Sequence, residues 1–99
     1  MTNGEKMAVD RQTRVFEKTR QINLTPLRTL HESERLRYID RVDSVNRYDL
    51  ARIVINQAIT NGMVQIDSHV ETTTDENGVS HDTYVCRAWV EVVVPEGKR

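Results

Sequence analysis

The chain has 99 residues, of which 37% are hydrophobic and 29% charged, and its formal net charge at neutral pH is −1. This length suits a single domain spanning residues 1–99, and no run of about 18 apolar residues that could cross a membrane is present. The N-terminal residues lack the apolar core of a signal peptide, and a lone cysteine, Cys86, excludes an internal disulfide. Together these features favour a reducing, cytoplasmic setting.

The chain begins with a predicted helical arm over residues 10–22. Asp10 suits the N-cap position, and Val15, Thr19 and Ile22 follow at i, i+4 and i+7 on one face. The apolar stripe is thin, so ion pairs along the helix are expected to add a few tenths of a kcal/mol each.

A second helix is predicted to begin at Thr25 and Pro26. Threonine caps a helix well, and proline at the first helical position loses no hydrogen bond. Apolar residues then repeat at i+3 (Leu36, Ile39, Val42). Ser33 could instead cap a fresh helix, which would place a kink beside it.

The strongest helical pattern covers residues 45–61, after the capping pair Asp43 and Ser44. Its apolar residues form a wide arc, which predicts burial on more than one side (Tyr48, Leu50, Ala51, Ile53, Val54, Ile55, Ala58, Ile59). Gly62 is expected to end this helix in the left-handed conformation. We interpret the segment as the central core helix.

From Met63 onward the hydrophobic period becomes two, which predicts an antiparallel β-hairpin around the turn DENG. A two-residue turn at Asn77 and Gly78 would mix polar and apolar side chains on both faces. A three-residue loop over 76–78, with Gly78 left-handed as a bulge, gives one coherent apolar face instead. Its partners include Val64 with Val90, Ile66 with Ala88, Ser68 with Cys86, Val70 with Tyr84 and, on the other face, Asp67 with Arg87.

Chemistry-bearing residues do not form a recognisable site in the sequence. A calcium loop built on Gly78 would start at Thr73 and end at Tyr84, without the carboxylate that position twelve requires. His69 and His81 are too far apart on the hairpin to share a metal, and Cys86 points away from both. No phosphate loop or nucleophile motif occurs. We therefore expect no enzyme activity, no catalytic residue, no metal and no cofactor.

The outer side of the hairpin is the predicted contact surface, formed by Met63, Val85, Arg87, Trp89 and Val93. Tryptophan is enriched at interface hot spots, and a lone hairpin has two unpaired edges. Self-association into a larger sheet, or a dedicated protein partner, would cover this surface. The alternative is that the N-terminal segment or the first helix folds back over Trp89.

A nucleic-acid interface is the competing prediction. Residues 1–60 carry 11 Lys and Arg against 8 Asp and Glu, and residues 61–99 carry 3 against 7. The basic residues expected to bind phosphates lie on the N-terminal arm (Arg11, Arg14, Lys18, Arg20). Acidic residues are interspersed, and no aromatic platform accompanies the arginines.

The fold predicted from these patterns is α+β, with two or three N-terminal helices followed by a C-terminal antiparallel hairpin packed on the helix at 45–61. Residues 1–8 and 95–99 are expected to be flexible, and 25–94 to form the core. The function predicted is a non-catalytic protein-binding module, an adaptor or inhibitor acting as a homodimer. A small-ligand binder with a pocket between helix and sheet is a third, unspecific alternative. Short charged chains of this kind are common among phage and mobile-element accessory proteins, which is an association and not a physical argument.

Overall fold

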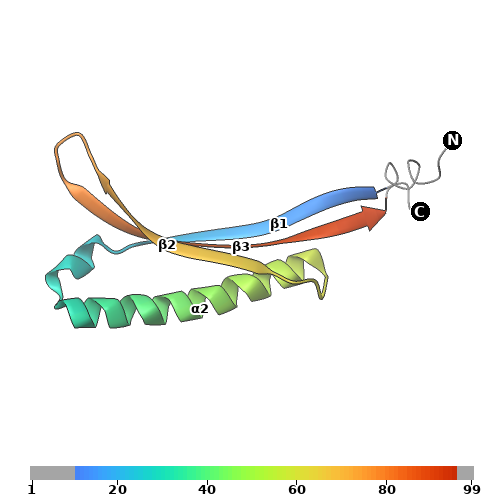
Figure 1. Ribbon diagram of the computed structural model, residues 1–99, viewed down its shortest axis with the longest axis horizontal. Helices are drawn as coiled ribbons and strands as arrows, with labels where there is room; N and C mark the ends of the chain where they lie inside the picture. The colour runs from blue at the N-terminus through green and yellow to red at the C-terminus, as the bar shows by residue number, and fades with distance from the viewer. Residues whose placement is uncertain (1–10, 96–99) are drawn as a thin grey trace.

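The computed structural model describes residues 11–95, which form a three-stranded sheet, a short 3-10 helix and one long α-helix (Figure 1). In chain order the elements are β1 (Arg11–Asn23), η1 (Thr25–Thr29), α2 (Glu32–Ala58), β2 (Gln65–Thr74) and β3 (Ser80–Pro95). The α+β class is thus confirmed. Pro95 ends β3, and the other residues predicted to be flexible lie outside the described range.

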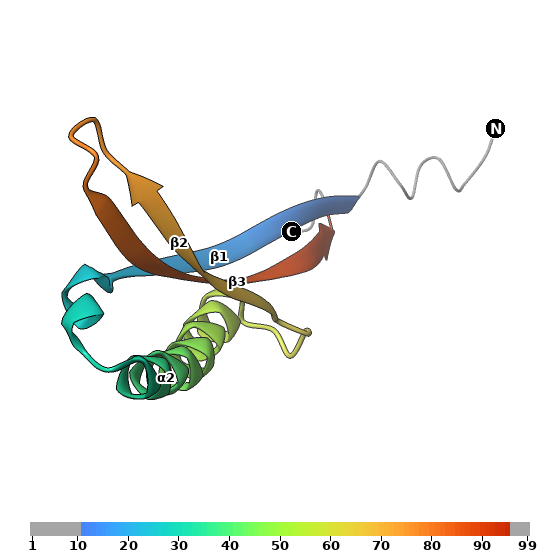
Figure 2. The same ribbon diagram turned by 60° about the vertical axis from the view of Figure 1, so that its left-hand side comes forward.

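The central strand of the sheet is β3, because the strand order is β1-β3-β2. Both outer strands run antiparallel to β3, so β1 and β2 are parallel to each other. Their connection passes through α2, which covers one face of the sheet only (Figure 2). We call the side toward α2 the inner face and the opposite side the outer face.

The prediction of a helical arm over residues 10–22 is wrong, because residues 11–23 form strand β1. This strand pairs with β3 along its whole length, from Arg11 opposite Pro95 to Asn23 opposite Thr83. Long-range pairing overrides a weak helical pattern, and the β-branched residues of the segment suit a strand. The predicted N-cap, Asp10, lies outside the described residues.

The helix predictions need further corrections. Thr25 and Pro26 begin η1 rather than a long helix. The long helix α2 begins at Glu32, where the ring of His31 accepts a hydrogen bond from the Ser33 backbone N–H. It then continues without a break past the supposed capping pair at 43–44, since Asp43 bonds to other side chains instead.

Helix α2 also ends earlier than predicted, at Ala58. The left-handed residue that terminates it is Ile59, with φ of 51°, whereas Gly62 is not left-handed. A β-branched residue in this region is a genuine outlier, because its side chain crowds the backbone.

Replacing Ile59 by glycine should therefore stabilise the protein by about 1 kcal/mol. The side chain is 89% exposed, so its removal sacrifices little packing. Urea denaturation of the variant should show a higher midpoint than the wild type at an unchanged slope. Ile55→Gly, inside the helix, is the control and should destabilise; an unchanged or lower midpoint for Ile59→Gly would contradict the strain argument.

The hairpin register matches the prediction. Ile66 lies opposite Ala88 and Asp67 opposite Arg87, as the three-residue loop requires. The Asp75 N–H donates to the Val79 carbonyl at 2.9 Å, and Gly78 has φ of +80°. The Asp75 carboxylate also accepts from the backbone N–H groups of Asn77 and Val79, which closes the loop locally.

The core lies between α2 and the inner face. Its buried apolar residues come from the chain before η1, from α2 and from alternate positions of β3 (Leu24, Leu50, Val54, Tyr84, Cys86, Ala88, Val90). In the same described part of the chain, eleven large hydrophobic residues are exposed, among them Val15, Tyr48 and Met63. The core is therefore small, and much apolar surface has no partner within residues 11–95.

Candidate interaction surface

The predicted contact residues of β3 share the outer face. Val85, Arg87, Trp89 and Val93 occupy odd positions, whereas the even positions Cys86, Ala88 and Val90 are buried in the core and Val92 is half-buried. This separation follows from the period of two along a strand. Within residues 11–95, no helix covers the outer face (Figures 1 and 2). The predicted fold-back of the N-terminal segment over Trp89 therefore does not involve residues 11–23, which are in the sheet.

Trp89 is half-buried, and its ring is held by a neighbouring cation. The guanidinium carbon of Arg87 lies 4.2 Å from the centroid of the Trp89 ring. Arg87 also donates through Nε to Glu17 Oε1 at 2.9 Å. Glu17 lies opposite Trp89 in the ladder, so carboxylate, guanidinium and indole form one contiguous group across β1 and β3. This group gives the outer face an aromatic centre flanked by an ion pair.

Two expected features of this surface differ in the structure. Asp67 lies opposite Arg87, but the ion pair that Arg87 makes is with Glu17 on β1. Met63 precedes β2 and lies exposed in the loop between α2 and the sheet, not on a strand.

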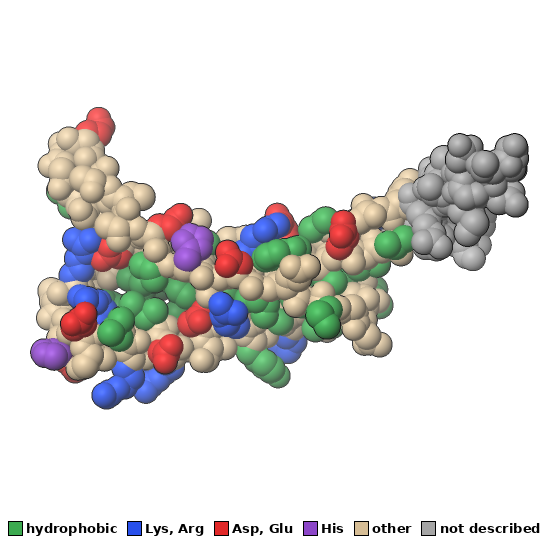
Figure 3. All heavy atoms as spheres, viewed as in Figure 1, with side chains coloured by type: hydrophobic (Ala, Val, Ile, Leu, Met, Phe, Trp, Pro, Cys, Tyr) green, Lys and Arg blue, Asp and Glu red, His purple; other side chains and the backbone are tan. Residues whose placement is uncertain are grey.

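Strand β1 adds residues to the outer face that were not predicted. Val15 is exposed there, opposite Glu91, and so extends the apolar surface of Trp89 and Val93 onto a second strand. Figure 3 shows hydrophobic side chains at the surface of both the sheet and the helix, interspersed with charged ones. The signal in the sequence was the β-branched content of the segment, which the competing helical spacing obscured.

The basic residues of the nucleic-acid prediction do not lie on a helix. Arg14, Lys18 and Arg20 occupy even positions of β1, on the inner-face side, and Arg14 and Lys18 are exposed. The Arg20 guanidinium donates hydrogen bonds to side chains of α2. For Arg11 the structure describes the backbone alone. The positive charges therefore form no helical phosphate-binding face.

Arg20 instead ties β1 to α2. Its Nη1 donates to Asn46 Oδ1 and to Asp49 Oδ2, each at 2.9 Å. Asn46 is the buried polar residue of the helix, and its amide also donates to the Val42 carbonyl. Hydrogen bonds from Arg20 and Arg52 lower the pKa of the Asp49 carboxyl. This network satisfies the buried amide, so its role is structural.

A second network ties α2 to the hairpin. The Tyr84 hydroxyl donates to Asp43 Oδ1 at 2.7 Å, while Arg47 donates to Asp43 and to the Ser68 hydroxyl. Burial and the bond to Asp43 raise the pKa of Tyr84. Burial alone would raise the pKa of Asp43, but hydrogen bonds from Tyr84, Ser68 and Arg47 outweigh it and lower that pKa.

A third carboxylate, Asp82, joins the hairpin to η1. It accepts hydrogen bonds from Arg28 and Thr72, and these bonds lower its pKa to about 2. At pH values between about 2 and the ordinary aspartate pKa of about 3.9, the Asp82 carboxyl is protonated in the unfolded chain but not in the folded chain. Stability is therefore lost as the pH falls through this window.

Acidification from about pH 5 to about pH 2.5 should accordingly lower the urea midpoint of the wild type more than that of Asp82→Asn. The variant lacks the carboxylate of Asp82. The other carboxylates are present in both proteins and lower the two midpoints by the same amount. Equal losses in the two proteins would show that Asp82 does not contribute to the acid sensitivity.

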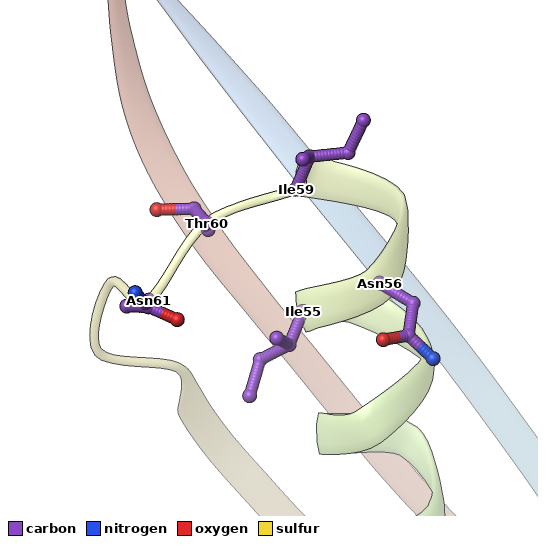
Figure 4. Close-up of a pocket in the computed structure, with 5 residues that line it drawn as sticks. All are labelled: Ile55, Asn56, Ile59, Thr60 and Asn61. Atoms are coloured by element: carbon purple, nitrogen blue, oxygen red, sulfur yellow. The ribbon is translucent and has the colours of Figure 1, made fainter.

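One hollow in the described part of the chain is lined by side chains without titratable groups. The hollow in Figure 4 has a volume of about 580 Å³ and lies at the C-terminal end of α2, lined by Ile55, Asn56, Ile59, Thr60 and Asn61. None of these side chains titrates near neutral pH, and they project in different directions. Among residues 11–95, no three His, Cys, Asp or Glu side chains gather as metal ligands.

Comparison of the chain with protein families, curated proteins and solved structures gave no match. In the range that the structure describes, no helix has both the length and the hydropathy of a membrane span.

Proposed function

We propose that the chain is a non-catalytic protein-binding module that acts as a homo-oligomer through the outer face of its sheet, working as an adaptor or inhibitor of a partner protein. The observation that carries the proposal is the outer face around Trp89, which no helix of residues 11–95 covers, with Val15, Val85 and Val93 beside it. A sheet normally buries one face and hydrates the other, so apolar side chains on both faces favour a second contact.

The geometry around Trp89 supports a binding role more than a solvated surface. The Arg87 guanidinium stacks on the indole and is fixed by Glu17, so the ring loses little freedom on binding. Tryptophan and arginine are the residue types most enriched at binding hot spots. Charged groups at the margins, such as Asp67 and Glu91, would give the apolar centre a polar rim.

The setting we propose is cytoplasmic. The single cysteine, Cys86, is reduced and completely buried, where it packs as a small apolar residue.

Trp89→Ala tests the proposal. The substitution should weaken self-association at least about tenfold and abolish co-purification of any protein partner, because a central aromatic anchor is lost. Sedimentation velocity gives the mass, and circular dichroism shows whether the fold is kept. Tyr48→Ala, which removes an exposed aromatic ring from α2, is the matched control and should leave both readouts unchanged. An unaltered mass and unaltered partners for Trp89→Ala would refute the outer face as the contact.

A further inference from the structure

The free edge of β2 has a backbone pattern that another copy of the chain could match. Asp75 and Val79 form a hydrogen-bonded pair at the end of the hairpin. Because bonding alternates along an antiparallel ladder, the odd residues of β2 bond to β3 and the even residues direct N–H and C=O groups away from it. The residues whose backbone faces the free edge are Ile66, Ser68, Val70, Thr72 and Thr74.

We propose that two copies of the chain pair antiparallel through β2, about a twofold axis at Val70. In this register each outward-facing residue meets another, from Ile66 opposite Thr74 of the second copy to Val70 opposite Val70. All five pairs are of the hydrogen-bonded type, giving about ten bonds between the copies. The product is one six-stranded sheet with both helices on the same side.

The side chains favour the same register. On the outer face His69 lies opposite Glu71 of the second copy, and the symmetry axis makes this pair twice. These are non-hydrogen-bonded pairs, in which side chains approach most closely. A twofold axis at His69 would set Asp67 against Glu71, and an axis at Glu71 would set two glutamates against each other. The register with complete backbone pairing is therefore also free of like-charge contacts.

The other free edge, on β1, does not offer this match. The Leu24 N–H donates to the Asp82 carbonyl, so the even residues of β1 bond to β3 and the odd ones face outward. Complete pairing of β1 with itself would centre on Glu17, opposing two glutamates, and would set Arg14 against Arg20. Like charges directly opposite are destabilising, and charged edges are a common protection against pairing.

The surroundings of β2 leave room for a second copy. Helix α2 packs mainly on β3 and β1 and touches β2 less. Val70 is 45% exposed and lines a hollow of about 500 Å³ together with Leu24 and Ile39. Among residues 11–95 the hairpin has no third strand beyond Thr72 and Asp82, because β1 ends at Asn23, opposite Thr83; the tip projects past the helix as a ribbon of two strands (Figure 2). An isolated two-stranded ribbon is marginally stable, and a second β2 would give it a third strand.

Val70→Pro tests the pairing selectively. Proline removes an outward N–H without breaking the ladder to β3, so the fold should be kept. Sedimentation velocity should show half the mass of the wild type. Gln21→Pro removes an outward N–H from the β1 edge and is the matched control, which should keep the wild-type mass. A wild-type mass for Val70→Pro, with its circular dichroism intact, would overturn the proposal.

Charge substitutions provide a test that does not depend on proline. His69→Glu places a carboxylate opposite Glu71 of the second copy and should weaken association at least about tenfold. The double variant His69→Glu with Glu71→Lys restores opposite charges and should regain the wild-type mass. If both variants are folded and the double variant does not regain the wild-type mass, this register is excluded.

Amide hydrogen exchange separates this inference from the proposed function. The amides of Ser68, Val70 and Thr72 should be protected in the associated protein, whereas the outward amides of β1 should exchange freely. Outer-face contacts alone would leave the β2 edge unprotected and would make the mass respond to Trp89→Ala only. Edge pairing alone would reverse that outcome, with the mass responding to Val70→Pro and not to Trp89→Ala.

Discussion

Replacing Leu50 by alanine should lower the free energy of unfolding by about 3 kcal/mol. Leu50 is completely buried between α2 and the inner face, in a cluster with Val54, Cys86 and Ala88. The cost combines the transfer of the lost side-chain atoms with the cavity that they leave. A small core has few other side chains that could move into the cavity. We therefore expect a loss of unfolding free energy typical of sites that do not collapse around a cavity.

Urea denaturation of wild type and variant at one protein concentration measures this difference. The concentration must be fixed because association adds to the apparent stability. Leu36→Ala is the matched control, since Leu36 lies on the exposed side of α2 and is 57% exposed. Its cost should stay within about 0.5 kcal/mol. Similar midpoints for the two variants would mean that α2 does not pack on the sheet through Leu50.

Replacing Tyr84 by phenylalanine should cost about 2 kcal/mol, although it removes a single oxygen atom. The hydroxyl donates to the ionised Asp43 at 2.7 Å, and hydrogen bonds to charged groups contribute about 1.5–3 kcal/mol. The phenylalanine leaves Asp43 with Arg47 as its remaining strong partner. Because the raised pKa keeps the Tyr84 hydroxyl protonated in the folded protein, this stability is fully present below the ordinary tyrosine pKa of about 10, and it is lost progressively as the pH rises from there through the raised pKa of the folded state.

Two measurements check this second prediction. The first is the urea midpoint near neutral pH, with Tyr48→Phe as control, because the Tyr48 ring is 73% exposed and its loss of a hydroxyl should be neutral. The second is an alkaline absorbance titration of folded wild type and Tyr84→Phe, whose difference reports on Tyr84 and should show its ionisation only above the ordinary tyrosine pKa of about 10. Ionisation of Tyr84 at or below that value in a folded protein would contradict the bond to Asp43.

The hairpin could be predicted from the sequence because its determinants are local. Gly78 and Asp75 specify the loop, and the loop length together with alternation of apolar residues specifies which side chains share a face. The burial of Cys86 and the outward position of Trp89 follow from that register. These are the parts of the candidate surface that the sequence predicts well.

Strand β1 could not be predicted in the same way, because its partner lies about seventy residues away. Glu17 contacts Arg87 across the sheet, and no residue near Glu17 in the sequence indicates that contact. The segment 11–23 also satisfies a thin helical spacing, and a local pattern cannot decide between the two. For the same reason the role of Arg20 could not be predicted, because its partners Asn46 and Asp49 belong to the helix.

Helix boundaries failed for a related reason. Asp43 has the chemistry of an N-cap, but its carboxylate bonds to Tyr84 and Arg47 in the middle of a continuous helix. At the other end, Ile59 adopts the left-handed conformation expected of Gly62. At Asp43, tertiary contacts outweigh the local preference for a helix start, which is common where a helix packs closely on a sheet.

The emission of the single tryptophan, measured across a wide range of protein concentrations, tests the central claim most directly. Trp89 reports only on the outer face, since no other tryptophan is present. If copies of the chain bind through this face, the emission should shift to shorter wavelength as the concentration rises, in step with a mass above 11.5 kDa. Emission that stays constant while the mass rises, or a mass of 11.5 kDa at every concentration, would contradict the claim.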